Sequence, residues 1–141
     1  MPGGPGTAEA LSDNELVSWI REAHGYAKWT TSVCSGSFLL GAAGILKGRK
    51  ATSHWGWAGK LPAVGAEHVA DRVVVDGNVV TAAGVSAGID MALALLAKAQ
   101  DDETAKTVQL AIEYDPAPPF DAGNPYQAPT SRREAALSLI R

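Results

Sequence analysis

Apolar positions along the chain recur at two spacings, one typical of helices and one typical of strands. Between residues 12 and 25 they fall three or four positions apart, so we expect a helix with one apolar face that ends near Gly25. That face carries Leu16, Trp19, Ile20 and Ala23. Ser12 is followed three residues later by Glu15, which is the spacing of a capping box and predicts where this helix begins.

A strand and a second helix are predicted directly after this segment. The run 29–33 contains β-branched residues and predicts a strand, and the apolar segment 37–43 predicts a helix that ends at Gly44 or Gly48. The tight connection between them holds Cys34, the only cysteine of the chain. Such a strand-to-helix turn, a nucleophile elbow, exposes its side chain to the unpaired N–H groups of the following helix, which favours a reactive thiolate. Burial as a small apolar residue is the competing interpretation of a lone cysteine.

The second half of the chain predicts a hairpin followed by helices. The runs 72–75 and 79–82 flank Asp76-Gly77, which is a strong signal for a two-residue hairpin turn. Helical spacing then predicts two further helices, over residues 86–99 and 103–113.

The last part of the chain changes character. Closely spaced prolines in the segment 115–129 exclude a helix or a central strand, so we expect an ordered arm or a linker there. A helical pattern resumes over 130–141, with a second capping box at Ser131 and Glu134. We therefore expect a partial domain over 1–128, which includes the proline-rich arm, and a C-terminal helical tail.

Composition limits the function classes. With 141 residues and 46% hydrophobic content, the chain has the size and the core of one domain. Its net charge of −3 gives no general attraction to phosphate backbones, and no apolar window is long enough to cross a membrane, so we expect neither a nucleic-acid partner nor a membrane partner. A single cysteine allows no internal disulfide, which suits the cytoplasm. No Cys/His cluster has the spacing of a metal site.

Four motifs and the tail together resemble a known family. The motifs are Pro-Gly-Gly-Pro-Gly-Thr at 2–7, Ser-Val-Cys-Ser-Gly at 32–36, Ala-Thr-Ser-His-Trp at 51–55 and Gly-Val-Ser-Ala-Gly-Ile-Asp at 84–90. In this order and approximate spacing they resemble the DJ-1/PfpI superfamily, over nearly the whole chain. The tail Glu-Tyr-Asp-Pro-Ala-Pro-Pro-Phe-Asp-Ala-Gly at 113–123 is similar to that of the isonitrile hydratases within it. The fold implied is α/β, a flavodoxin-like (class I glutamine amidotransferase-like) doubly wound sheet.

The resemblance also implies site residues. Cys34 matches the family nucleophile, and the backbone N–H groups of Gly4 and Ser35 match the pair that holds an oxyanion or polarises a bound intermediate. Ser35 stands where the hydratases more often carry threonine, and either hydroxyl can donate a hydrogen bond. His54 falls where some members place a histidine near the thiol, although a structural role beside Trp55 is an equally good interpretation.

The implied activity is that of a hydro-lyase: cysteine-dependent hydration of a small-molecule isonitrile to an N-substituted formamide, without metal or organic cofactor, in a homodimer. In the superfamily a carboxylate that pairs with the thiol comes from a helix ahead of the Pro-Gly-Gly turn. No residue of this sequence stands there, so we expect an N-terminally truncated domain with impaired activity.

A sensor module is the alternative. The amidotransferase-like ligand domains of AraC-type transcription regulators share the motifs around Cys34, His54 and Asp90. A regulator would continue into a helix-turn-helix domain, whereas this sequence ends at Arg141. Together with the Glu-Tyr-Asp-Pro tail, this favours the hydratase.

Overall fold

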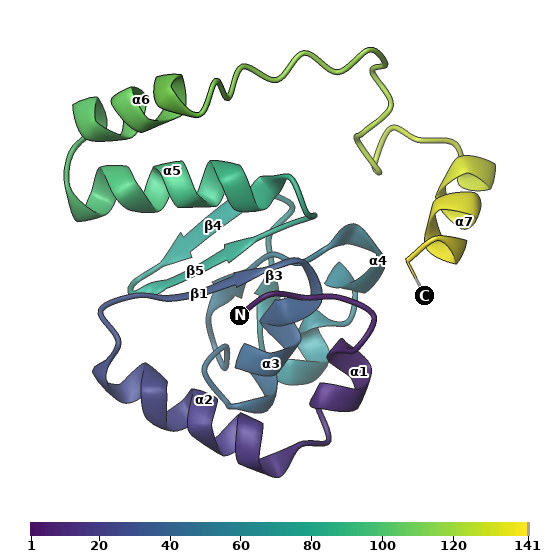
Figure 1. Ribbon diagram of the computed structural model, residues 1–141. Helices are drawn as coiled ribbons and strands as arrows, with labels where there is room; N and C mark the ends of the chain where they lie inside the picture. The colour runs from purple at the N-terminus through teal and green to yellow at the C-terminus, as the bar shows by residue number, and fades with distance from the viewer. Residues whose placement is uncertain (141) are drawn as a thin grey trace. The chain divides into compact units, whose positions relative to one another are not determined.

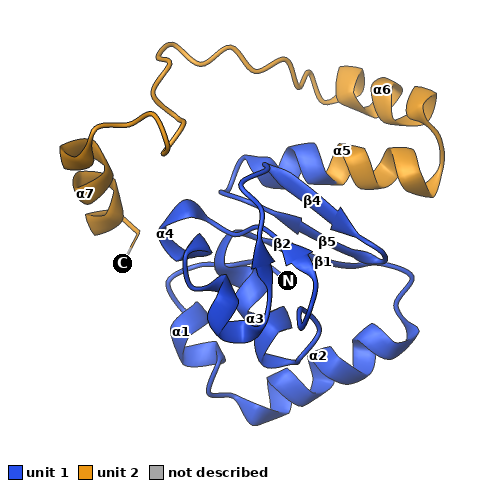
Figure 2. Cartoon of the chain, turned by 180° about the vertical axis from the view of Figure 1, so that it is seen from behind, with its two compact units in different colours: residues 1–91 blue, residues 92–141 orange. Residues whose placement is uncertain are grey.

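The computed structural model describes residues 1–140, which form two compact units. The first unit comprises Met1–Met91 and the second begins at Ala92 (Figure 2).

A three-stranded sheet forms the centre of the first unit (Figure 1). Its strands, in spatial order, are β1 (Thr30–Val33), β5 (Val79–Ala82) and β4 (Val73–Asp76). β1 runs parallel to β5, with Thr30 opposite Val79, and β4 pairs with β5 in antiparallel orientation. The predicted hairpin is confirmed, but its turn residues are Gly77 and Asn78, because Asp76 still pairs with Val79.

A second, two-stranded parallel sheet is joined to the first through side chains. Its strands are β2 (Lys50–Ala51) and β3 (Glu67–His68). The Lys50 N–H donates to the Asp76 carboxylate over 2.8 Å, and the Thr52 N–H donates to the Thr81 hydroxyl over 2.9 Å. These bonds bring the segment after β2 close to the carboxyl end of β5.

Helices of 4 to 13 residues accompany these sheets in the first unit, and α2 and α3 lie side by side against the same side of the three-stranded sheet (Figure 1). They are α1 (Thr7–Ala10), α2 (Asn14–Tyr26), α3 (Ser37–Ala42) and α4 (Trp55–Ala58), with 3₁₀ turns at Cys34–Gly36 and Leu61–Val64. The core between them contains the fully buried Leu40, Leu46 and Leu61. Burial of such side chains stabilises the fold by about 1.5–3 kcal/mol each.

The start of α2 corrects one prediction. Asp13, not Ser12, caps the helix, since the Asp13 carboxylate accepts the Leu16 N–H over 2.9 Å. The capping box with Glu15 is therefore wrong. The apolar face of α2 is also less buried than expected: Ile20 is 3% exposed, but Trp19 is 57% exposed.

The end of α3 is one of the two alternatives predicted. Ala43 is the last residue in helical conformation and Gly44 follows with φ +80°. Residues with a Cβ atom rarely adopt this left-handed conformation, so glycine ends the helix here.

The second unit consists of helices and an extended arm. It begins within α5 (Ala87–Ala99) and continues with α6 (Asp102–Ala111), an arm without helix or strand, and α7 (Thr130–Ser138). Asp101 caps α6, and its hydrogen bond from the Thr104 N–H lowers the pKa of the Asp101 carboxyl. Pro129 precedes α7 with no side-chain cap, so the second capping box at Ser131 and Glu134 is wrong. Arg141 lies outside the described residues.

No helix within residues 1–140 has both the length and the apolar character needed to cross a lipid bilayer.

Candidate functional site

Cys34 occupies the turn between β1 and α3, as the sequence predicts. Its φ is +61°, in the left-handed region that non-glycine residues adopt at a cost of about 1–2 kcal/mol. The turn continues as a 3₁₀ helix over Cys34–Gly36 before α3 begins. Non-glycine residues in this conformation cluster at functional sites, where the surrounding structure holds them in place.

Hydrogen bonds on both sides of Cys34 hold this conformation. The Cys34 N–H donates to the Ala83 carbonyl over 2.8 Å. The Cys34 carbonyl accepts the hydroxyls of Ser53, over 2.9 Å, and of Ser37, over 3.3 Å. Ser53 follows β2 and is 2% exposed. Its contact with the elbow is long-range, so the sequence contained no direct signal for it.

The first residues of the chain lie directly against this turn. The Met1 nitrogen donates to the Thr31 carbonyl over 2.6 Å, and the Val33 N–H donates to the Met1 carbonyl over 3.1 Å. This is the hydrogen-bond pattern of a parallel strand pair. A Cβ atom at Gly3 would lie 2.5 Å from the Ser35 nitrogen, so only glycine fits there.

Gly4 and Ser35 lie together, but the Gly4 N–H is bonded to the Ser35 side chain, whereas the resemblance implies a pair of backbone N–H donors. A third residue joins them. The Gly4 N–H donates to the hydroxyls of Ser35 and Thr7, both over 3.1 Å. The two hydroxyl oxygens are 2.9 Å apart and hydrogen-bonded to each other. Ser35 is 2% and Thr7 is 4% exposed. Sequence reasoning missed Thr7, whose only signal was its place at the end of the glycine-rich motif.

His54 caps a short helix. Its Nδ1 atom accepts the Gly56 N–H over 3.2 Å at the start of α4, which places the proton of the neutral ring on Nε2. The ring lies 5.5 Å from that of Trp55, and burial lowers the pKa of His54 below the usual 6.5. The hydrogen bond and the aromatic contact fit a structural role for His54.

We expect the pH titration of His54 to have its midpoint below 6.5, because burial disfavours the charged ring. The unfolded chain then binds a proton at His54 more readily than the folded chain does. The contribution of His54 to stability is therefore present above about pH 6.5 and is lost as the pH falls through the lower pKa that His54 has in the folded state. Imidazole NMR signals of the folded protein measure the midpoint, and His54→Gln should remove this part of the pH dependence of unfolding. A midpoint at or above 6.5 would contradict the expectation.

The glycine-containing motif at residues 84–90 has a packing role. Arg72 forms an ion pair with Asp90 and donates to the Ser86 hydroxyl over 3.0 Å, which ties this turn to the residue before β4. A Cβ atom at Gly88 would lie 3.2 Å from the Val33 side chain. The motif thus lets the start of α5 approach β1 closely, next to Cys34.

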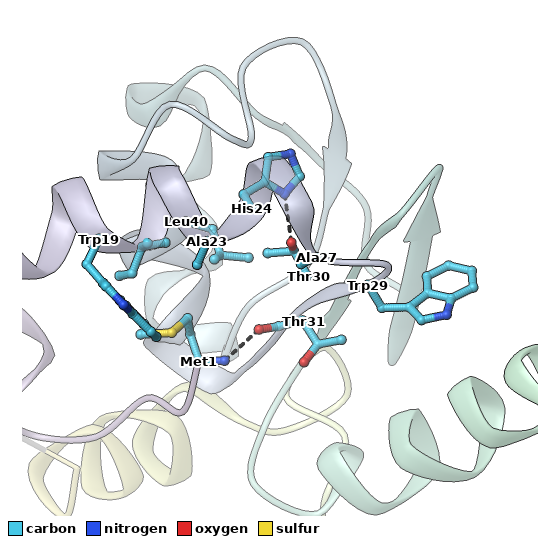
Figure 3. A pocket seen from close by; sticks show the side chains of 10 residues that line it. Met1, Trp19, Ala23, His24, Ala27, Trp29, Thr30, Thr31 and Leu40 are labelled. Carbon is cyan, nitrogen blue, oxygen red and sulfur yellow. Dashed lines mark hydrogen bonds between the residues drawn. The ribbon is translucent and has the colours of Figure 1, made fainter.

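A pocket of about 210 Å³ lies between α2 and β1 (Figure 3). Met1, Trp19 and Leu40 are among its mostly apolar lining residues, and His24 and Thr30 form a hydrogen bond of 2.7 Å in its wall. None of Gly4, Cys34, Ser35 and His54 lines it. The pocket is therefore separate from the candidate site. Within residues 1–140, no group of three or more His, Cys, Asp or Glu residues is arranged to hold a metal ion.

Comparisons with known proteins extend this picture. The model of the DJ-1/PfpI family matches residues 1–98. An isonitrile hydratase of Pseudomonas putida is 47% identical over 144 residues, which cover 99% of this chain and 63% of the relative. The HTH-type transcriptional regulator CdhR of Pseudomonas aeruginosa is 32% identical over 103 residues, which cover 70% of this chain and 30% of the regulator.

A solved structure agrees with the fold. The crystal structure of a ThiJ/PfpI family protein from Pseudomonas syringae superposes with a TM-score of 0.91 at 47% identity, covering 97% of this chain and 57% of that one. The flavodoxin-like α/β class expected from the sequence is thereby confirmed. The chain spans 63% of the length of the hydratase and 57% of that of the crystallised protein.

Proposed function

The chain belongs to the DJ-1/PfpI family, and from this premise we propose that it is an isonitrile hydratase-like protein in which Cys34 is the nucleophile. The observation that carries the proposal is the left-handed backbone of Cys34 in the turn between β1 and α3, which is held by hydrogen bonds with Ala83, Ser37 and Ser53. A residue with merely a packing role would not need this conformation. The 47% identity with a hydratase along nearly the whole chain supports the choice of reaction.

The chemistry requires a thiolate, a proton and a water molecule. The Cys34 sulfur forms a bond to the terminal carbon of R-NC, and that carbon takes up a proton, which gives a thioimidate R-N=CH-S-Cys. Water then adds to the same carbon, the nitrogen is protonated, and the C–S bond breaks. The products are R-NH-CHO and the free thiol, so the net reaction consumes one water.

Gly4 and Ser35 are proposed to assist these steps. The Gly4 N–H already donates to the Ser35 and Thr7 hydroxyls, so Gly4 assists by orienting the Ser35 hydroxyl. The backbone N–H and the hydroxyl of Ser35 are the donors proposed to stabilise negative charge that develops during water addition. We further propose that the protein acts on a small isonitrile in the cytoplasm and as a homodimer. His54 is left with a positioning role at α4.

The test is direct turnover of cyclohexyl isocyanide, with the N-cyclohexylformamide product measured by mass spectrometry. In water enriched in ¹⁸O, the proposal predicts one labelled oxygen in each product molecule. Cys34→Ala protein serves as the control for spontaneous hydration. Product formation no faster than in this control would overturn the proposal.

A sensor domain is the second candidate, favoured by the match to the regulator CdhR over 70% of this chain. Such a domain binds its ligand without consuming it. Calorimetric binding of an isonitrile that is recovered unchanged would favour the sensor, whereas formamide release favours the hydratase.

A further inference from the structure

Three groups at the start of the chain and in the elbow form a closed hydrogen-bonded triangle. Its corners are the Gly4 N–H, the Thr7 hydroxyl and the Ser35 hydroxyl, and its sides measure 3.1, 3.1 and 2.9 Å. Both side chains are buried. Thr7 is the first residue of α1 and Ser35 is next to Cys34, so the triangle connects the glycine-rich turn to the nucleophile.

Counting protons shows what Thr7 contributes. The Gly4 N–H is shared between the two hydroxyl oxygens, and one hydroxyl proton lies in the bond between Thr7 and Ser35. One hydroxyl proton remains for use outside the triangle. If Thr7 donates to Ser35, that remaining proton belongs to Ser35, whose oxygen then accepts two hydrogen bonds and becomes a stronger donor.

We propose that Thr7 is a positioning residue whose hydroxyl donates a hydrogen bond to the Ser35 hydroxyl oxygen. The hydroxyl proton of Ser35 is then free to bond to the atoms that react at Cys34. The inference rests on the proposed function, in which Cys34 is the nucleophile. Thr7 itself touches neither the sulfur nor the substrate in this mechanism, and its effect passes through Ser35.

The experiment exploits the single cysteine. Iodoacetamide alkylates only Cys34, so its rate reports on this thiol without any isonitrile. Thr7→Val removes the hydroxyl at nearly constant shape and is expected to slow alkylation at pH 7 roughly fivefold, which is the worth of one hydrogen bond. It should lower kcat for the isonitrile by a similar factor at unchanged KM. Thr7→Ser, which keeps the hydroxyl, should restore both.

Two controls make the outcome specific. In a Ser35→Ala background Thr7→Val should cause no further loss, since the path through Ser35 is already absent. The matched change Thr107→Val, on an exposed face of α6, should leave the alkylation rate unaltered. Thermal unfolding checks that each variant is folded, and Thr7→Ala replaces Thr7→Val if the valine variant does not fold.

The results separate this inference from the proposed function. An unchanged alkylation rate in Thr7→Val, or an equal loss with and without Ser35, overturns the role of Thr7. Absence of isonitrile turnover in the unaltered protein overturns the hydratase proposal instead, and the alkylation rates still decide whether Thr7 acts through Ser35.

Discussion

Cys34→Ser is expected to lower isonitrile turnover by about a thousandfold or more, because a serine hydroxyl is a far weaker nucleophile than a thiolate at neutral pH. The substitution keeps the size of the side chain and the backbone bonds to Ala83, Ser37 and Ser53. The measurement is kcat with cyclohexyl isocyanide, together with the unfolding free energy in urea. Turnover within tenfold of the unaltered protein would remove Cys34 from the role of nucleophile.

A second substitution at the same position tests whether the strain serves catalysis. Cys34 adopts φ +61°, which glycine tolerates without cost. Cys34→Gly should therefore abolish turnover and yet raise the free energy of unfolding by up to about 1 kcal/mol, less the loss of packing by the thiol. If Cys34 served packing alone, Cys34→Gly would lower the free energy of unfolding and leave turnover unchanged. Strong destabilisation by glycine would show that Cys34 is retained as part of the core.

Local patterns explain why much of the fold was predictable. The hairpin of β4 and β5, the strand before Cys34 and the helix after it each depend on residues close in sequence. The place of Cys34 in the turn between them was predictable for the same reason, whereas its left-handed backbone was not predicted and is a finding of the structure. Gly44 ends α3 for a local reason as well.

The wrong and missing predictions have two physical origins. One is competition between neighbouring residues for the same structural role, and the other is contact between segments far apart in sequence. Ser12 and Asp13 can both cap α2, and only the three-dimensional path of the chain decides that Asp13 does so. The hydroxyls of Thr7 and Ser53 meet the elbow from segments 28 and 19 residues away from their partners. No periodicity or turn signal encodes such pairs, because their geometry depends on how the segments pack.

The close contact between the first residues and the elbow leads to the prediction with the largest expected effect on stability. Gly36 has ordinary helical dihedral angles, φ −57° and ψ −22°, so alanine fits its backbone. The Cβ atom of an alanine at position 36, however, would lie 2.8 Å from the Pro2 carbonyl carbon and closer still to the Met1 carbonyl oxygen. Backbone atoms cannot turn aside as a flexible side chain can. We expect Gly36→Ala to lower the free energy of unfolding by about 3 kcal/mol.

Gly25→Ala is the matched control, measured by urea unfolding under the same conditions. Gly25 lies near the end of α2 and has no atom within 4 Å of the position of an added Cβ. Alanine there should raise the free energy of unfolding by about 0.5–1 kcal/mol through its higher helix propensity. Gly36 is the N-cap of α3, where alanine gains no such propensity, so a loss of stability in Gly36→Ala beyond the cost of an alanine N-cap reports the steric overlap. If the two variants had equal stability, residues 1–4 would not be packed against the elbow, and the Gly4, Thr7 and Ser35 triangle would lose its basis.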